Sequence, residues 1–137
     1  MQTKRFAAFA PAVLVSFLMA APVLAHHGNA AFDEAKKLTV KGTVVEWFWA
    51  NPHCLLKFDV KDGSGNVVHW VAEASNPPDM INRGWSRNSL KPGDEVSVTL
   101  SPVKNGQPIG RIQQIVFANG HILGTQPPRP GDNPSQP

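Results

Sequence analysis

The sequence predicts an all-β fold: a small five-stranded barrel with one short helix between the third and fourth strands. Three observations support this prediction. Five segments are rich in β-branched and aromatic residues or alternate between apolar and polar residues. Turn residues separate them, and the period of two is lost only between the third and fourth segments. This order is typical of the oligonucleotide/oligosaccharide-binding (OB) barrel, and the alternative is a small β-sandwich.

The chain begins with the three zones of a secretory signal peptide. Lys4 and Arg5 give a positive start, a long apolar run follows, and small residues end at Ala25. This layout predicts that residues 1–25 are removed and that the mature protein, periplasmic or secreted, begins at His26.

A retained membrane anchor is the alternative interpretation of this start. It is disfavoured because Pro11 and Pro22 interrupt the apolar run and no second such run follows. We therefore expect no stable membrane span after cleavage.

The mature part of the chain is nearly neutral and has one cysteine. Of 13 basic residues, 11 lie beyond the leader, together with all 10 acidic residues. A nucleic-acid partner would need a cationic stripe, so none is expected. Cys54 is the only cysteine, which excludes an intramolecular disulfide.

The first three strands are expected at residues 38–49, 54–61 and 67–74. In the first, the apolar residues change parity near Gly42, which predicts a bulge or sharp coil in a long strand that serves both halves of the barrel. The second alternates cleanly and places Cys54 on the apolar face, where we expect a small buried hydrophobic residue and not a nucleophile.

A short helix and two more strands complete the domain. Ser75 or Asn76 can cap the helix, which should end near Asn82. The last two strands are expected at residues 95–101 and 111–118. The expected core consists of inward-facing residues of all five strands: Val44, Leu56, Phe58, Val68, Trp70, Val96, Val98 and Phe117.

These elements divide the chain into four parts. The signal peptide covers residues 1–25, a polar lead-in covers 26–37, and the β domain covers 38–124. The tail, residues 125–137, contains five prolines and is expected to be disordered because it has little to bury.

The histidines suggest a metal site. If cleavage exposes His26, its α-amine and imidazole can chelate one transition-metal ion. Imidazole nitrogens suit copper, zinc and nickel, and copper(II) is the ion we expect first. His53, in the loop before the second strand, is the best further ligand, with His27 in support. The alternative is a solvated terminus and a His53 ring that bonds the backbone, since no HxH, HExxH or paired-cysteine spacing is present.

An aromatic face is the other candidate binding site. Trp47 and Trp49 share a parity, as a stacking pair for a glycan or a partner protein would, although core packing is the alternative. Candidate residues for this face are Trp47, Trp49, Asn51, His69 and Glu73. His69 and Glu73 lie roughly 13 Å apart on a strand, too far for a general-base pair, so each should have its own contact.

Several motifs together resemble a family of small exported bacterial proteins known only as a domain of unknown function. They are HHG after the leader, ANPH, the W-x-x-E of Trp70 to Glu73, and LKPGDEV. The resemblance implies a periplasmic one-domain β protein and supplies no activity. The chain also resembles periplasmic OB-fold copper chaperones, but only Met80 remains after the leader, so a methionine-rich copper(I) site cannot form.

We therefore expect an exported, non-enzymatic binding protein. The leading hypothesis is a copper site made by His26, His27 and His53. The alternative is a metal-free accessory module that docks a partner protein or a glycan through the aromatic face.

Overall fold

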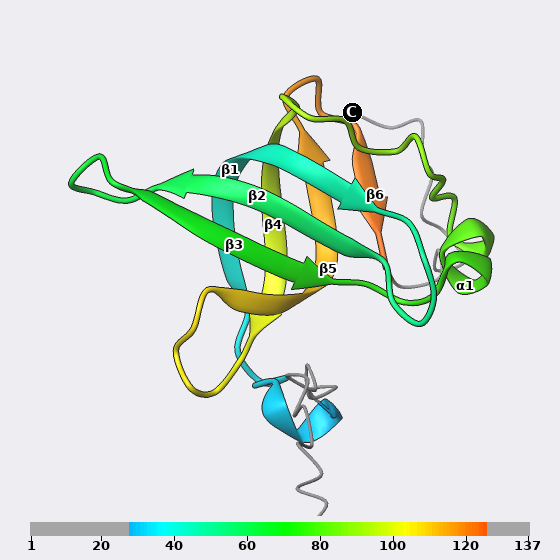
Figure 1. The fold of residues 1–137 in the computed structure, drawn as a ribbon, viewed down its shortest axis with the longest axis horizontal. Helices are drawn as coiled ribbons and strands as arrows, with labels where there is room; N and C mark the ends of the chain where they lie inside the picture. Colours follow the sequence, from blue (N-terminus) through cyan, green and yellow to red (C-terminus); the bar gives the residue numbers. More distant parts are fainter. Residues whose placement is uncertain (1–27, 126–137) are drawn as a thin grey trace, which may run out of the picture.

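The computed structural model describes residues 28–125. In this part of the chain, six strands form one sheet in the order β3-β2-β1-β4-β5-β6 (Figure 1). The strands are β1 (Leu38–Phe48), β2 (Leu55–Lys61), β3 (Val67–Glu73), β4 (Glu95–Pro102), β5 (Ile109–Phe117) and β6 (Ile122–Gly124). The predicted signal peptide, His26, His27 and tail residues 126–137 lie outside the described residues.

A parallel pairing between β3 and β5 closes the sheet into a barrel. Val71 pairs with Ile109, and Glu73 pairs with Arg111, while every other pairing in the sheet is antiparallel. Closure leaves a five-stranded mixed barrel, which confirms the predicted fold class and distinguishes it from the sandwich alternative. β6 was not predicted, because three residues are too short to show a period of two.

β1 contributes to both halves of the barrel, as predicted. Its first half pairs with β4 from Leu38 to Thr43, and its second half pairs with β2 from Thr43 to Phe48. The register shift lies between Val44 and Glu46, not at Gly42. The bulge explains why the apolar residues change parity, since one extra residue moves all later side chains to the opposite face.

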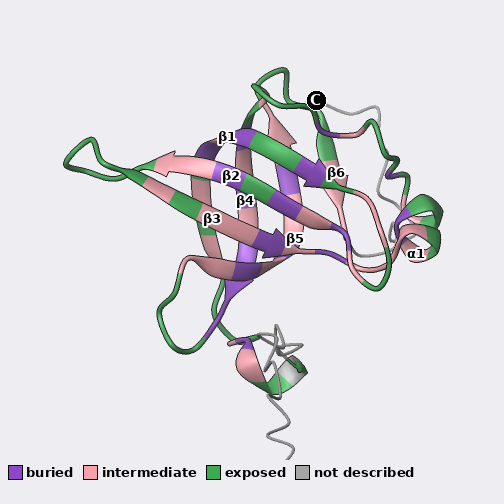
Figure 2. Ribbon diagram, in the orientation of Figure 1, coloured by how far each residue is buried: buried purple, intermediate pink, exposed green. Residues whose placement is uncertain are grey.

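The core fills the barrel interior, which appears as purple segments on all five barrel strands in Figure 2. Five of the eight predicted core residues are buried: Val44, Leu56, Phe58, Val96 and Val98. The other three are only partly buried: Val68, Trp70 and Phe117. Val68 and Trp70 lie in the part of the β2–β3 hairpin that leads to its projecting turn, so neighbours cover them incompletely (Figure 1).

The short helix α1 (Pro77–Asn82) lies at one end of the barrel, between β3 and β4 as predicted. Asn76 caps it by accepting a hydrogen bond from the Asp79 backbone N–H at 3.0 Å. Met80 of the helix and Trp85 beyond it are fully buried, and the Trp85 Nε1–H donates to the Gly124 carbonyl at 2.7 Å. The helix segment is thereby joined to β6.

The lead-in is anchored at the other side of the barrel by one short 3-10 turn (Asn29–Ala31) and one aromatic residue. Phe32 is 2% exposed and forms a β-bridge with Val103, in the connection between β4 and β5. The Asp33 N–H also donates to the Pro102 carbonyl at 2.8 Å. The lead-in therefore packs on the barrel before β1 begins.

Candidate functional site

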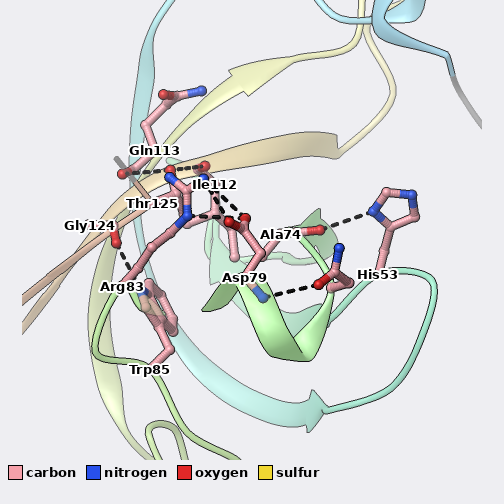
Figure 3. Close-up of polar contacts among 10 residues, drawn as sticks. His53, Ala74, Asp79, Arg83, Trp85, Ile112, Gln113, Gly124 and Thr125 are labelled. Atoms are coloured by element: carbon pink, nitrogen blue, oxygen red, sulfur yellow. Dashed lines mark hydrogen bonds and ion pairs between the residues drawn. The ribbon is translucent and has the colours of Figure 1, made fainter. Parts of the chain in front are cut away.

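A polar groove of about 560 Å³ lies where β3, β5 and α1 meet. Six ionisable residues from distant parts of the sequence line it: Glu34, His53, Glu73, Asp79, Arg83 and Arg111. Three carboxylates thus face two guanidinium groups and one imidazole. Figure 3 shows the helix side of this groove, with His53 and the Asp79–Arg83 pair beside α1.

Arg111 connects three elements within the groove. It follows Gly110 on β5, and the parallel pairing places it beside Glu73 at the end of β3. Its Nη2 donates to Glu73 Oε1 at 3.1 Å, and its Nη1 donates to Glu34 Oε1 of the lead-in at 2.9 Å. Its guanidinium carbon also lies 4.3 Å from the centroid of the Phe32 ring, a cation–π geometry.

The helix side of the groove carries its own ion pair. Arg83, the C-cap residue of α1, bonds Asp79 of the first turn through Nε and Nη2, each at 3.1 Å from an Asp79 oxygen (Figure 3). A hydrogen bond from the Ser75 side chain, followed by the Arg83 guanidinium, lowers the pKa of Asp79 below its usual value. Both effects favour the ionised carboxylate, so Asp79 is a stable negative charge near neutral pH.

His53 lies at the edge of the same groove. Its Nδ1 is 3.2 Å from the Ala74 carbonyl oxygen (Figure 3). The backbone fixes this position from both sides, because the Cys54 N–H donates to Ser75 at 3.0 Å and the Ala74 N–H donates to Cys54 at 2.8 Å. The bond between the His53 ring and the backbone, which the alternative to the metal site expected, is therefore present.

The predicted aromatic face is divided between core and surface. The Trp47 side chain is buried, with 9% of the residue exposed, and its Nε1–H donates to the Ser86 carbonyl at 3.1 Å. Trp49 is partly buried and contacts Trp47, with ring centroids 5.8 Å apart. Asn51 is exposed in the loop that follows. Core packing is thus the main role of Trp47, while Trp49 retains a surface.

His69 and Glu73 each have their own partner, as the sequence indicated. His69 Nδ1 lies 2.6 Å from Asp59 Oδ1 on the neighbouring strand. Glu73 contacts Arg111 in the groove. Of the five candidates for the aromatic face, Glu73 alone belongs to the groove, where it joins His53.

Within residues 28–125, no group of three or more His, Cys, Asp or Glu side chains is arranged to hold a metal ion. His121 is exposed, with its ring 5.6 Å from that of Phe117. Two of the three predicted metal ligands, His26 and His27, lie outside the described residues. The third, His53, lies in the groove.

The groove also contains four ionisable residues that the sequence analysis did not single out: Glu34, Asp79, Arg83 and Arg111. The Asp79–Arg83 spacing of four residues on a predicted helix was a usable signal. No such signal existed for Arg111, because its partners are 38 and 77 residues away in the sequence.

Buried Cys54 matches its prediction. It is 0% exposed, and burial raises the pKa of its thiol above the ordinary value. The thiolate needed for nucleophilic attack or metal binding is therefore disfavoured.

Comparisons with known proteins identify a family and a weak structural similarity. Residues 13–121 match the model of DUF6152, described as a family of unknown function, which confirms the predicted kind of family. No curated protein matches the sequence. A similar solved structure is described as the crystal structure of the ZRD-deleted mutant of TiaS in complex with agmatine, with 22% identity and a TM-score of 0.45. The similarity covers 62% of this chain and only 22% of that one.

None of the helices among residues 28–125 is long and apolar enough to cross a bilayer.

Proposed function

We propose that this chain, which belongs to the DUF6152 family, is an exported, non-enzymatic protein that binds copper(II) through its mature N-terminus and His53. In this proposal the α-amine and imidazole of His26 chelate the ion, His53 supplies a further nitrogen, and His27 supports the site. Imidazole and amine nitrogens suit copper(II) ahead of the other divalent ions of its row.

One observation carries the proposal: the lead-in and His53 line the same groove. Glu34 of the lead-in and His53 of the β1–β2 loop both contribute to its walls. His26 precedes Glu34 by eight residues, which can span at most about 28 Å. In this proposal His26 returns to the edge of the groove where His53 lies.

The orientation of the His53 ring also suits a metal ligand. Metal-binding histidines usually donate their second ring N–H to a carboxylate or a backbone carbonyl, which fixes the tautomer. The Nδ1 of His53 lies 3.2 Å from the Ala74 carbonyl oxygen, so Nδ1 is the donor and Nε2 is the coordinating nitrogen in this proposal.

The test compares copper(II) binding by three forms of the mature protein. The first begins at His26, the second has one alanine added before His26, and the third carries His53→Ala. The added alanine keeps both imidazoles but moves the free amine away from His26. We expect each change to weaken binding by at least about tenfold in a calorimetric titration.

His69→Ala is the matched control, because His69 is an exposed histidine whose partner is Asp59 and which lies outside the groove. This variant should bind copper as the unmodified protein does. Equal binding by the first three forms would show that the terminal-histidine site does not exist.

The proposed export and removal of residues 1–25 are tested separately. The intact mass of protein recovered from a secreting cell should correspond to a chain that begins at His26. A mass that includes residues 1–25 would contradict cleavage and remove the amine from His26.

A second candidate function is docking of a partner protein or a glycan through the aromatic end of β1. Phe48 is 48% exposed and pairs with Leu55 on β2, and the partly exposed Trp49 follows it. A photo-crosslinking residue at position 48 should give a discrete adduct in the exporting cell. The same residue at position 122, where Ile122 is 54% exposed on β6, should not. Equal labelling at both positions would contradict a specific face.

A further inference from the structure

Two asparagine–glycine pairs occur in the chain, and both lie in exposed turns. Asn105 and Gly106 belong to the β4–β5 connection, while Asn119 and Gly120 belong to the β5–β6 turn. Neither glycine has an atom within 4 Å of the position that a Cβ would occupy. The backbone nitrogen after each asparagine is therefore open to the asparagine side chain, because glycine places no side chain beside it.

The pair in the β4–β5 connection is held loosely. The Gly106 N–H donates to the Val103 carbonyl oxygen at 3.4 Å, longer than the roughly 2.7–3.2 Å that is usual for such a bond. The Asn105 Oδ1 accepts from the Gln107 N–H at 3.1 Å, so the side chain is folded over the backbone that follows it. The Gly106 nitrogen can therefore leave its partner at little cost and approach the Asn105 side chain.

The pair in the β5–β6 turn is held more tightly. The Gly120 N–H donates to the Phe117 carbonyl at 2.9 Å, and the Phe117 N–H donates to the His121 carbonyl at 2.9 Å. The Asn119 Oδ1 also accepts from the His121 N–H at 2.9 Å. Moving the Gly120 nitrogen breaks a well-formed hydrogen bond and distorts a turn that is closed on two paired strands.

We propose that Asn105 is a site of spontaneous deamidation and that it reacts ahead of Asn119. The Gly106 nitrogen loses its proton and attacks the side-chain carbonyl carbon of Asn105, while the bond from this carbon to Nδ2 breaks and ammonia leaves. Water then opens the resulting succinimide ring at either carbonyl, which gives aspartate or isoaspartate. The net reaction consumes water and releases ammonia, with no oxidant or reductant. It is independent of the proposed copper site.

The position of Asn105 gives this reaction a structural consequence. Before it, the Lys104 N–H donates to Ala31 of the lead-in at 3.0 Å. After it, the Pro108 carbonyl accepts from the Val71 N–H at 3.0 Å, next to the β3–β5 pairing that closes the barrel. Isoaspartate adds a main-chain carbon between these two contacts, and both products add a negative charge. We therefore expect both contacts to loosen in the deamidated protein.

The test measures both pairs in the same folded sample. The purified protein is incubated in mildly alkaline buffer, and the peptides that span each pair are quantified by mass spectrometry after digestion. We expect Asn105 to convert roughly fivefold faster than Asn119, which is the effect of one additional hydrogen bond on a rate. Equal conversion of the two residues, or faster conversion of Asn119, would overturn the inference.

Denatured protein is the matched control, because both pairs are Asn-Gly and the fold is what distinguishes them. In concentrated guanidinium chloride the two rates should become similar. A preference for Asn105 that persists in the denatured protein would overturn the structural explanation. Asn105→Gln should abolish the faster conversion, because glutamine would have to form a larger ring. Persistence of the fast conversion in this variant would overturn the assignment to Asn105.

Hydrogen exchange measures the structural consequence. In protein enriched for deamidated Asn105, the backbone amides of Lys104 and Val71 should exchange faster than in fresh protein. The Phe117 amide, which bonds His121 at the opposite end of β5, should exchange as before. Unchanged exchange at Lys104 and Val71 would overturn the expected loosening of the lead-in and of the barrel closure.

Discussion

At the residue scale, Gly42 of β1 lies against the backbone of β2 with no room for a side chain. A Cβ atom built at Gly42 would lie 2.5 Å from the Asp59 carbonyl oxygen and 2.9 Å from Phe58 Cδ2. The Asp59 oxygen belongs to the backbone of β2, so it cannot move aside as a flexible side chain would. Gly42 is therefore required for close strand approach at the point where β1 changes partners, while the bulge itself lies three residues later at Val45.

We expect Gly42→Ala to lower the free energy of unfolding by roughly 1–3 kcal/mol, the usual cost of overpacking a fitted interior. Chemical denaturation measures the change. Gly63→Ala is the control, because a Cβ there meets no atom within 4 Å. Equal effects at the two positions would contradict the close-approach explanation.

Cys54 gives a second prediction at this scale. Because the thiol is fully buried and its pKa is raised, we expect almost no reaction with a disulfide reagent such as DTNB in the native protein. In concentrated guanidinium chloride the single thiol should react completely. Rapid reaction of the native protein would contradict this burial. It would mean that the β1–β2 loop opens readily and that the groove edge near His53 opens with it.

At the element scale, α1 is short and depends on its flanking polar contacts. A six-residue helix is too short to be stable alone. The Asn76 cap, the Asp79–Arg83 pair and the burial of Met80 hold it at the end of the barrel. Of these contacts, the Asp79–Arg83 pair is the one that acid weakens, because protonation neutralises the Asp79 carboxylate.

We expect Asp79→Asn to lower stability near neutral pH and to have less effect in acid. The pKa of Asp79 is lowered in the folded protein, so its ionised form stabilises the fold above the unfolded-state pKa of about 4. This contribution is lost as the pH falls through the lowered native pKa. Denaturation midpoints of Asp79→Asn and the parent protein are measured at about pH 7 and about pH 3. The difference in stability between the two proteins should be smaller at the lower pH.

Arg83→Met removes one of the groups that lower the pKa of Asp79. The difference in stability between Arg83→Met and the parent protein should therefore also be smaller in acid than near neutral pH. A difference between Asp79→Asn and the parent protein that stays constant with pH would show that the carboxylate charge is not what stabilises α1.

At the scale of the whole molecule, barrel closure and β6 extend the packed structure as far as Thr125, the last described residue. β6 pairs with β5 from Gln114 to Val116, and Thr125 Oγ1 donates to the Ile112 carbonyl at 2.9 Å. The Trp85 indole donates to Gly124 as well. The packed domain therefore extends to Thr125.

Removal of residues 126–137 should leave the melting temperature nearly unchanged, since a proline-rich polar segment has little apolar area to bury. Removal of residues 122–137 should lower it clearly, because this deletion also takes β6 and the bonds of Gly124 and Thr125. Thermal unfolding of both truncated proteins measures this. A large drop for the shorter deletion would place the domain boundary within the tail.

The sequence by itself determined the five barrel strands, most of their inward faces and the helix, but not β6. The alternation from Cys54 to Lys61 predicted which side chains point inward, and Cys54, Leu56 and Phe58 are buried as expected. The polar cap before two prolines predicted the start of α1 at Pro77. These features depend on the geometry of consecutive residues, so a short stretch of chain contains the information.

Only the tertiary structure decided which side chains meet. The groove depends on Arg111 lying beside Glu73 through a parallel pairing, and beside Glu34, which is 77 residues away. The structure also decided that Trp47 faces the core and that Val68 and Trp70 are only partly covered. A local pattern predicts which face of a strand a side chain lies on. Whether that face is buried depends on strands and loops distant in the sequence, and closure of the barrel determines where these lie.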